Sequence, residues 1–318
     1  MRVLLIAGGW SSERDVSLHG AQGIGKALHQ LGHEVTLFDP QYSLDGLLEA
    51  AAVHDFAFLN LHGSPGEDGL VQALLDSVGC PYQGTGPAGS FLALNKAAAK
   101  AVFRRHAIPT PDWVFVPARP AQGWTPGLAY PLFVKSNTGG SSLCLSRVAN
   151  ETELHAALEA IFTHGDEAII EPAIPGVEVT CGILGDAAMP PILIKPAQGV
   201  FFDYHAKYTP GAATELCPAP LPPEVTARVQ ELTLRAHHAL GLSGYSRGDF
   251  ILGENGDLQL LEMNTLPGMT PTSLVPQEAK AIGLDFAALI ARLMELGLQQ
   301  RGPASANTQA TPHNGPKG

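Results

Sequence analysis

The segment Leu260–Ser273 reads LLEMNTLPGMTPTS and places two polar side chains inside an apolar, strand-like run. Upstream of it, Arg247–Leu252 (RGDFIL) is a second apolar, β-prone run, and the turn-forming sequence GENGD lies between them. This pattern predicts an antiparallel hairpin. Residues two apart on a strand face the same side, so Glu262 and Asn264 should share one surface, with Asp249 near the same end of the pair.

These three side chains supply two carboxylates and an amide oxygen. Hard divalent cations such as Mg²⁺ take ligands of this kind, with phosphate oxygens completing the shell. Arg247 lies two residues before Asp249 and should add a fixed cation, so the surface has the parts that phosphoryl transfer needs. The competing interpretation is a solvated acidic strand face. Such a face rarely places Glu-x-Asn within an apolar strand and follows it with Pro-Gly-x-Thr-Pro.

The two motifs, Gly-x-x-Arg-x-Asp and Glu-x-Asn-x-x-Pro-Gly-Met-Thr, resemble the metal-binding end of the D-alanine–D-alanine ligases, in the ATP-grasp superfamily. The resemblance covers essentially residues 1–300. It implies an α/β chain in which an ATP-grasp fold follows a Rossmann-like parallel βαβ domain. The implied limits are 1–87 for this N-terminal domain, 88–174 for a central subdomain with a glycine-rich loop, 175–300 for a C-terminal subdomain with a lid loop and the metal site, and 301–318 for a disordered tail.

Composition agrees with a globular enzyme. The chain has 318 residues, of which 45% are hydrophobic and 15% charged, enough for two or three domains with sizeable cores. A net charge of −11 argues against a general nucleic-acid binder. The four cysteines form no Cys-x-x-Cys pair, which indicates reduced thiols. Because neither a signal-peptide core nor a run of membrane-span length is present, we expect a soluble cytoplasmic protein without membrane partners.

The sequence pattern in the first third of the chain predicts a βαβ unit. Val3–Ala7 is a continuous apolar run that ends in Gly8-Gly9, typical of a buried parallel strand and a tight turn. An amphipathic helix and the strand Glu34–Phe38 follow. The glycines do not form Gly-x-Gly-x-x-Gly, so the dinucleotide signature is absent. Ligands in such folds sit at the carboxyl ends of strands, where Asp15 and His62 are predicted.

Asp15 supports two interpretations. It is either a capping-box acid opposite Ser12 at the start of the helix, or a site residue. The resemblance favours the second, because the family segment Ser-x-Glu-x-Glu-Val-Ser places a carboxylate against the ammonium of the first D-alanine. We match this position to Asp15, which is one methylene shorter than glutamate. His62, followed by Gly-x-x-Gly-Glu-Asp-Gly, would border the same site, although a histidine at a strand end is more often a surface or capping residue.

The middle of the chain predicts a nucleotide-binding hairpin. Leu132–Lys135 is β-prone, and residues 136–142 are small and polar, so the hairpin could close its amides over phosphates. A helix is predicted over Ser90–Arg105. The resemblance implies that Lys96, on this helix, contacts phosphate, whereas Lys100 is interpreted as a solvated helix charge.

Further ATP-binding roles follow from the resemblance alone. Lys135 would bind ATP, and Ser141 would tie the active-site lids together. Glu171 would accept the adenine amino group, the Ile174 amide would meet the ring edge, and Glu178 would bind the ribose hydroxyls. Taken singly, a salt-bridged Glu171 and a solvated Glu178 would be the simpler interpretations.

The polar-aromatic stretch FFDYHAKYTPG has no clean period and suits a lid. By resemblance, Lys207 would reach the γ-phosphate and a substrate carboxylate, and Tyr208 matches the tyrosine of enzymes that prefer an amine nucleophile. Arg247 and the Gly268 amide would hold the tetrahedral oxyanion. Ser273, together with Lys207, would hold the second carboxylate.

The predicted activity is therefore ATP-dependent joining of two D-alanines through an acyl phosphate, for peptidoglycan precursors. The implied ligands are ATP, D-alanine and two Mg²⁺ or Mn²⁺ ions, and the implied assembly is a homodimer. One alternative is a related ATP-grasp ligase with another acid or nucleophile, such as D-lactate. Tyr208 argues against D-lactate, while Asp15 leaves substrate choice open. The other alternative is a non-catalytic nucleotide-binding protein, which the intact metal motif argues against.

Overall fold

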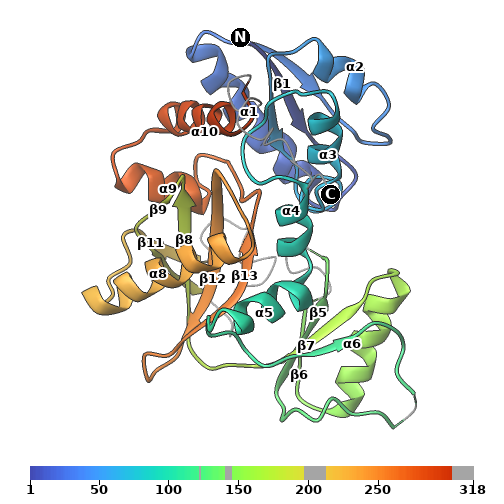
Figure 1. The fold of residues 1–318 in the computed structure, drawn as a ribbon. Helices are drawn as coiled ribbons and strands as arrows, with labels where there is room; N and C mark the ends of the chain where they lie inside the picture. The colour runs from blue at the N-terminus through green and yellow to red at the C-terminus, as the bar shows by residue number, and fades with distance from the viewer. Residues whose placement is uncertain (122, 140–144, 197–212, 303–318) are drawn as a thin grey trace, which may run out of the picture.

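The computed structural model describes residues 1–121, 123–139, 145–196 and 213–302 (Figure 1). The predicted site residues Ser141, Lys207 and Tyr208 and the predicted tail from 303 onward lie outside this part of the chain. The described residues form three sheets with helices packed beside them. This mixed α/β architecture, with a parallel sheet at the N-terminus, confirms the predicted fold class.

The N-terminal sheet is parallel and has the order β2-β1-β3. Its continuous apolar runs are buried because helices cover it, as parallel sheets require. The strands are β1 (Arg2–Ala7), β2 (Glu34–Phe38) and β3 (Phe56–Asn60). The helices are α1 (Arg14–Gln30), α2 (Leu47–Ala52) and α3 (Leu70–Ser77).

The central sheet is antiparallel and has the order β4-β7-β5-β6. Helix α6 (Glu151–Thr163) packs on it through an apolar stripe, and Asn150 caps the helix by accepting from the Glu153 amide at 3.0 Å. The strands are β4 (Val114–Val116), β5 (Leu132–Ser136), β6 (Ser146–Val148) and β7 (Ala168–Pro172).

The C-terminal sheet has the order β11-β10-β8-β12-β13, with β9 paired to β8. Its strands are β8 (Val177–Leu184), β9 (Ala187–Ala188), β10 (Ile192–Pro196), β11 (Ala213–Leu216), β12 (Tyr245–Leu252) and β13 (Leu258–Asn264). Strands β12 and β13 form the predicted hairpin, with Asp249 opposite Glu262 and a bulge immediately after Asp249. Helix α8 (Pro223–Ala239) packs beside this sheet.

Two C-terminal helices connect the C-terminal sheet to the N-terminal domain. These are α9 (Leu274–Ala281) and α10 (Phe286–Arg301). Figure 1 shows α10 lying beside α1 at the N-terminal end of the molecule. Leu289 and Leu293 of α10 share one buried cluster with Ile24 and Leu28 of α1. The N-terminal domain is therefore closed by the last helix of the described chain.

The prediction of one helix over Ser90–Arg105 is wrong. The structure has two helices, α4 (Pro87–Leu94) and α5 (Lys96–Arg105), separated by an extended Asn95. The Asn95 side chain accepts from the Ala98 amide at 3.0 Å, so it ends the apolar pattern of α4 and begins a new helix.

Both helices pack on the C-terminal sheet. Ala93 of α4 and Phe103 of α5 lie in one buried cluster with Leu232, Phe250 and Leu260. The limit of 88–174 for the central subdomain stays a prediction, and the first two helices of that range share the buried cluster of the C-terminal sheet.

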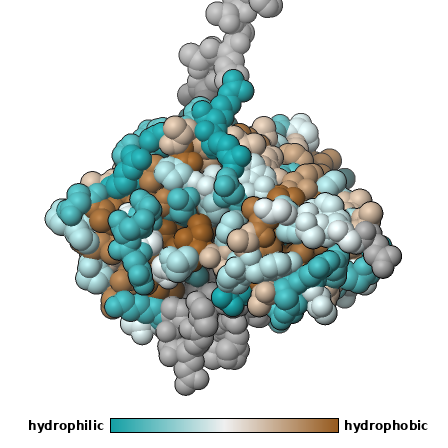
Figure 2. Space-filling view, turned by 90° about the horizontal axis from the view of Figure 1, so that it is seen from below, coloured by the Kyte–Doolittle hydropathy of each residue, from teal (hydrophilic) through white to brown (hydrophobic). Residues whose placement is uncertain are grey.

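Figure 2 views the molecule from the end where the central sheet and α6 lie, and hydrophilic and apolar side chains are interspersed over this face. Within the part of the chain that the structure describes, no helix is both long and apolar enough to cross a membrane.

Candidate active site

A large cavity of about 630 Å³ lies where the three sheets meet. Most predicted site residues that the structure describes line it, although they come from distant parts of the sequence. They are Asp15, His62, Lys96, Lys135, Glu178, Arg247, Asp249, Glu262, Asn264, Gly268 and Ser273. Glu171 and Ile174 are not among the described residues that line it. The fold therefore gathers the two ends of the predicted reaction into one space.

Asp249 is held rigidly at the floor of this cavity. Its Oδ1 accepts from Arg247 Nε at 2.8 Å and from Thr180 Oγ1 at 2.6 Å, and its Oδ2 accepts from Arg247 Nη2 at 2.7 Å and from Asn264 Nδ2 at 2.9 Å. The Asn264 amide nitrogen faces Asp249, so Oδ1 of Asn264 is left to bind a cation. The bidentate pair fixes Arg247 on the same surface.

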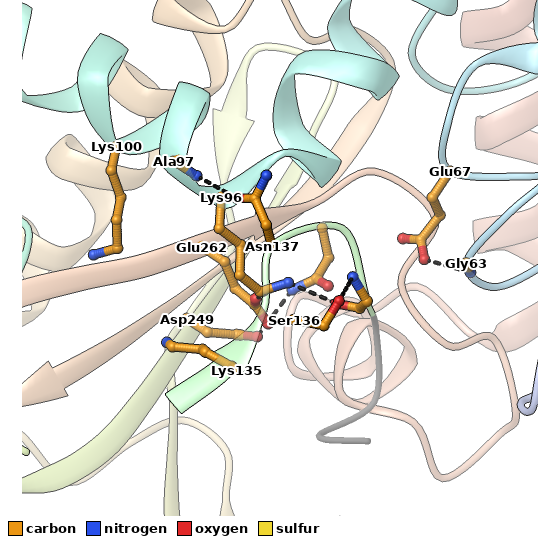
Figure 3. Close-up of polar contacts among 12 residues, drawn as sticks. Gly63, Glu67, Lys96, Ala97, Lys100, Lys135, Ser136, Asn137, Asp249 and Glu262 are labelled. Carbon is orange, nitrogen blue, oxygen red and sulfur yellow. Dashed lines mark hydrogen bonds and ion pairs between the residues drawn. The ribbon is translucent and has the colours of Figure 1, made fainter. Parts of the chain in front are cut away.

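Glu262 faces Lys96 across the cavity. The two side chains approach to 3.6 Å, and Lys96 Nζ also donates to the Gly139 carbonyl at 2.6 Å, at the start of the glycine-rich loop. Figure 3 shows Lys96, Lys135, Asp249 and Glu262 converging on one region. Lysine ammonium groups and oxygens suited to bind a metal thus lie close together, where the charge of a bound phosphate would have to be neutralised.

The donor set fits a hard cation that shares its ligands with a phosphate. Two carboxylates and one amide oxygen are too few for a closed metal cage, and the described chain contains no cluster of three or more His, Cys, Asp or Glu side chains suited to a metal. Magnesium normally keeps such an open arrangement and takes its remaining oxygens from substrate and water.

Burial tunes the charges in this cavity. Burial alone would lower the pKa of Arg247, but the Asp249 carboxylate outweighs it and raises the pKa, so the guanidinium stays charged. The same holds for Lys135. Burial alone would lower its pKa, but the Glu171 carboxylate raises it. Both cations are therefore permanent features of the site at neutral pH.

The interpretation of Lys100 as a solvated charge is wrong. Its side chain is fully buried, and its Nζ lies 2.9 Å from Glu171 Oε1. The other Glu171 oxygen lies 2.6 Å from Lys135 Nζ. Burial would raise the pKa of Glu171, but the two lysines lower it. Glu171 thus lies under the cavity as a doubly paired carboxylate, and its predicted contact with adenine stays a prediction.

The opposite end of the cavity is acidic and contains His62. Burial lowers the pKa of His62, although the nearby Glu13 opposes this shift. Glu67 accepts from the Gly63 amide at 2.8 Å, and burial raises its pKa to about 7 (Figure 3). Glu13 is only 7% exposed, whereas Asp15 is exposed at the rim. Buried carboxylates beside an imidazole suit recognition of a substrate ammonium.

The start of α1 bears on the two interpretations of Asp15. The helix begins after Glu13, and the described residues show no side-chain cap hydrogen bond there. Ser11 Oγ instead accepts from the Glu13 amide at 3.3 Å. The capping box opposite Ser12 is therefore not formed, and Asp15 remains a candidate site residue together with Glu13.

Ser273 lies at the start of α9 and lines the cavity. It is the N-cap residue of this helix, and its Oγ accepts from the Thr270 amide at 3.0 Å. A helix N-terminus favours negative charge, so a carboxylate could be held here. Gly268 lines the same wall.

Four residues of the site were missed by sequence reasoning: Glu13, Glu67, Lys100 and Thr180. Glu13 and Glu67 lie inside quoted motifs, and two acids in the segment at Glu13 were a signal that the carboxylate could be either one. Thr180 alternates with apolar residues on its strand and gave no local signal. Lys100 looked like any helix lysine, because its carboxylate partner lies on another sheet.

Comparison with known proteins decides the family. A model of the D-ala D-ala ligase C-terminus matches residues 102–295, more than half of the chain. A D-alanine–D-alanine ligase of Nitratidesulfovibrio vulgaris is 75% identical over 302 residues, which is 95% of this chain and all of that protein. The chain belongs to the D-alanine–D-alanine ligase family. The resemblance inferred from the motifs is thereby confirmed.

Solved structures of family members agree. The D-alanine–D-alanine ligase of Bacillus anthracis complexed with ATP superimposes with a TM-score of 0.84 at 34% identity, covering 95% of this chain and 98% of that one. The VanG D-Ala:D-Ser ligase of Enterococcus faecalis gives a TM-score of 0.78 at 28% identity, covering 93% and 99%. Since ligases named for different second substrates share this fold, the fold alone does not choose the nucleophile.

Proposed function

We propose that this chain joins two D-alanines at the expense of ATP. The main support is that one cavity contains, at one end, residues suited to bind phosphate and, at the other, residues suited to bind the ammonium and carboxylate groups of amino acids. Lys96, Lys135 and Arg247 lie with Asp249 and Glu262 at the first, and Glu13, His62 and Ser273 lie at the second. Family membership supports D-alanine as the substrate at both positions.

The first step activates a carboxylate. An oxygen of the first D-alanine carboxylate attacks the γ-phosphorus, the bond from that phosphorus to the bridging oxygen breaks, and ADP leaves with the electron pair. Lys96 and Lys135 would hold the phosphates, and a carboxylate near His62 would hold the ammonium. The product is D-alanyl phosphate. Exclusion of water protects it from hydrolysis.

The second step forms the peptide bond. The free amine of the second D-alanine attacks the acyl carbon, loses a proton, and inorganic phosphate leaves. Arg247 and the Gly268 amide would stabilise the oxyanion that develops, and Ser273 at the N-terminus of α9 would hold the second carboxylate. The predicted contributions of Ser141, Lys207 and Tyr208 complete the proposal from outside the described residues.

Mg²⁺ or Mn²⁺, in two ions as the resemblance implies, would offset the charge of the phosphate oxygens when bound. Asp249, Glu262 and Asn264 would supply its protein oxygens. The Asn264 amide nitrogen already faces Asp249, so its oxygen needs no reorientation to act as a ligand.

Phosphate release from ATP tests the activity. The enzyme is supplied with Mg²⁺ and ATP, and then with D-alanine, L-alanine, D-alanine plus D-serine, or D-alanine plus D-lactate. We expect release with D-alanine and not with L-alanine, and D-alanyl-D-alanine as the main product in every mixture near neutral pH. If the product that joins D-alanine to D-serine or D-lactate predominates, that compound is the second substrate in place of D-alanine. ATP binding without release in any mixture would favour a non-catalytic protein.

We further propose that the ligase is a cytoplasmic homodimer. The three described cysteines, Cys80, Cys181 and Cys217, are free thiols, which is typical of a reducing compartment. Light scattering on the purified protein tests the assembly, with a mass near twice 33.4 kDa as the expected result.

A further inference from the structure

A line of buried contacts runs beneath the cavity from the central sheet to the C-terminal sheet, through Lys100. Glu171 on β7 lies 2.9 Å from Lys100 Nζ, and Lys100 donates to Thr110 Oγ1 at 2.7 Å. Thr110 in turn donates to the Leu260 carbonyl of β13 at 2.7 Å. Leu260 lies two residues before Glu262 on the strand that carries the metal-type side chains.

Lys100 belongs to one lobe and its carboxylate partner to the other. Helix α5 packs in the core of the C-terminal sheet through Phe103, whereas β7 is a strand of the central sheet. The ion pair therefore crosses the boundary between the two lobes that enclose the phosphate end of the cavity. In Figure 3, Lys100 lies apart from Lys96, which reaches towards Glu262.

Two lysines share the Glu171 carboxylate, but only one of them lines the cavity. Lys135 contacts Oε2 at 2.6 Å and lines the cavity, while Lys100 contacts Oε1 and is fully buried. Burying such charges is costly, and apolar replacements are often tolerated or stabilising. Stability alone is therefore a weak reason for a third charged side chain, Lys100, beside Glu171 and Lys135.

We propose that Lys100 is a positioning residue for ATP binding. By occupying one oxygen of Glu171 it leaves Lys135 a single contact, so that the Lys135 ammonium stays directed into the cavity. Through Thr110 and Leu260 it also keeps the sheet that carries the glycine-rich hairpin aligned with β13. This inference rests on the proposed function in taking the ligand to be ATP. Without Lys100, Glu171 would turn both oxygens to Lys135 and draw its ammonium away from phosphate.

The test compares two changes of a basic residue to methionine on the same helix. Lys100→Met removes the buried charge at nearly constant length. Arg104→Met is the matched control, because Arg104 lies four residues on, pairs with exposed Asp112 at 2.7 Å and stacks over Trp113 at 4.2 Å. The Kd for ATP with Mg²⁺ is measured by calorimetry on each full-length protein, and the KM for D-alanine at saturating ATP.

We expect Lys100→Met to raise the Kd for ATP at least about ten-fold, as the loss of one charge-assisted contact to phosphate implies. Its KM for D-alanine should stay within about two-fold, and Arg104→Met should change neither value beyond that. A fall in melting temperature with an unchanged Kd for ATP would reduce Lys100 to a structural residue and overturn the proposal.

A second change tests the sharing of Glu171. Because Glu171 is itself a predicted adenine contact, Glu171→Gln is made both alone and together with Lys100→Met. If the two lysines share this carboxylate, Lys100→Met should raise the Kd for ATP by a smaller factor in the Glu171→Gln protein than in the wild type. An equal fold increase in both backgrounds would contradict the sharing mechanism. If Lys100→Met does not fold, Thr110→Val keeps the lysine and the side-chain shape, and should still raise the Kd for ATP at least about three-fold.

The two proposals fail in different ways. Wild-type protein that binds ATP but forms no dipeptide would sink the ligase assignment, while the Kd comparison would still decide the role of Lys100. Normal dipeptide formation with equal ATP affinity in wild type and Lys100→Met would sink only the positioning role.

Discussion

At the scale of single residues, two acids are candidates to bind the ammonium of the first D-alanine. The resemblance led us to Asp15, but this side chain is exposed at the rim, whereas Glu13 is buried beside His62. A charge-assisted hydrogen bond is stronger where water is excluded. The geometry therefore adds Glu13 as the stronger of the two candidates.

Exchange of each carboxylate for its amide separates them. We expect Glu13→Gln to lower kcat/KM for the first D-alanine at least about ten-fold, since a lost charged hydrogen bond is worth roughly 1.5–3 kcal/mol. Asp15→Asn should lower it less than about three-fold, because water screens an exposed charge. Initial rates at saturating ATP provide the measurement. The reverse order would restore Asp15 and leave Glu13 a structural acid.

Glu262 gives a second residue-scale prediction. Glu262→Gln should abolish turnover while the fold is retained, because an amide is a poorer ligand for Mg²⁺ and the Lys96 ammonium loses its partner. Phosphate release and the circular dichroism spectrum are compared with those of Glu254→Gln, an exposed acid in the turn of the same hairpin. Near-normal release from Glu262→Gln would remove this residue from the metal site.

At the scale of elements, the break between α4 and α5 sets the position of Lys96. Asn95 Oδ1 accepts from the Ala98 amide and from Asn137 Nδ2, and Asn137 Oδ1 accepts from the Ala97 amide at 2.9 Å. The two asparagines thus cap α5 jointly and join it to the strand that leads into the glycine-rich loop (Figure 3). Lys96 is consequently the first residue of a helix that points its amides at this strand.

Removal of this cap should destabilise the protein. Asn95→Ala should lower the free energy of unfolding by about 1 kcal/mol, since the Ala98 amide of α5 and Asn137 Nδ2 both lose their acceptor, and Asn95→Ser should retain most of this stability as a competent cap. Urea unfolding followed by circular dichroism gives both values. Equal stability of the alanine and serine variants would show that α5 does not depend on this side chain.

At the scale of the whole molecule, one buried acid couples stability to pH. Glu278 on α9 is fully buried between the C-terminal sheet and the N-terminal core, where its Oε1 accepts from the Gly182 amide at 2.8 Å. Burial raises its pKa to about 8. Among the described side chains, its Oε2 has no hydrogen-bond partner. The native state therefore keeps a proton that the unfolded chain loses above its ordinary carboxyl pKa.

The sign of the effect follows from proton counting. Between the ordinary carboxyl pKa and about 8 the native state binds more protons, so the contribution of Glu278 to stability is complete at low pH and declines as pH rises. Glu278→Gln should flatten this decline by at most about 1.4 kcal/mol per pH unit. Urea unfolding at pH 5, 6.5 and 8, with Glu254→Gln as the control, measures it. Parallel pH profiles for wild type and Glu278→Gln would refute it.

Much of the fold could be predicted from the local sequence pattern. The continuous apolar run of β1 and the alternation around Glu262 and Asn264 predicted elements that the structure contains, because strand and helix periodicities are properties of neighbouring residues. The same reasoning joined α4 and α5 into one helix, since an asparagine within an apolar pattern gives no certain end signal until its capping partner is known. Helices α2 and α9 were not predicted.

The sequence by itself determined which side chains share the predicted metal-binding surface, because a strand pair with a two-residue period leaves Glu262, Asn264 and Asp249 little choice of face. Only the tertiary structure decided which of Glu13 and Asp15 is buried and with which carboxylate Lys100 pairs. Burial and charge pairing depend on groups that are distant in the sequence: Glu171 on β7 lies 2.9 Å from Lys100 on α5, and Glu13 is buried near His62. Local periodicity carries no information about such partners.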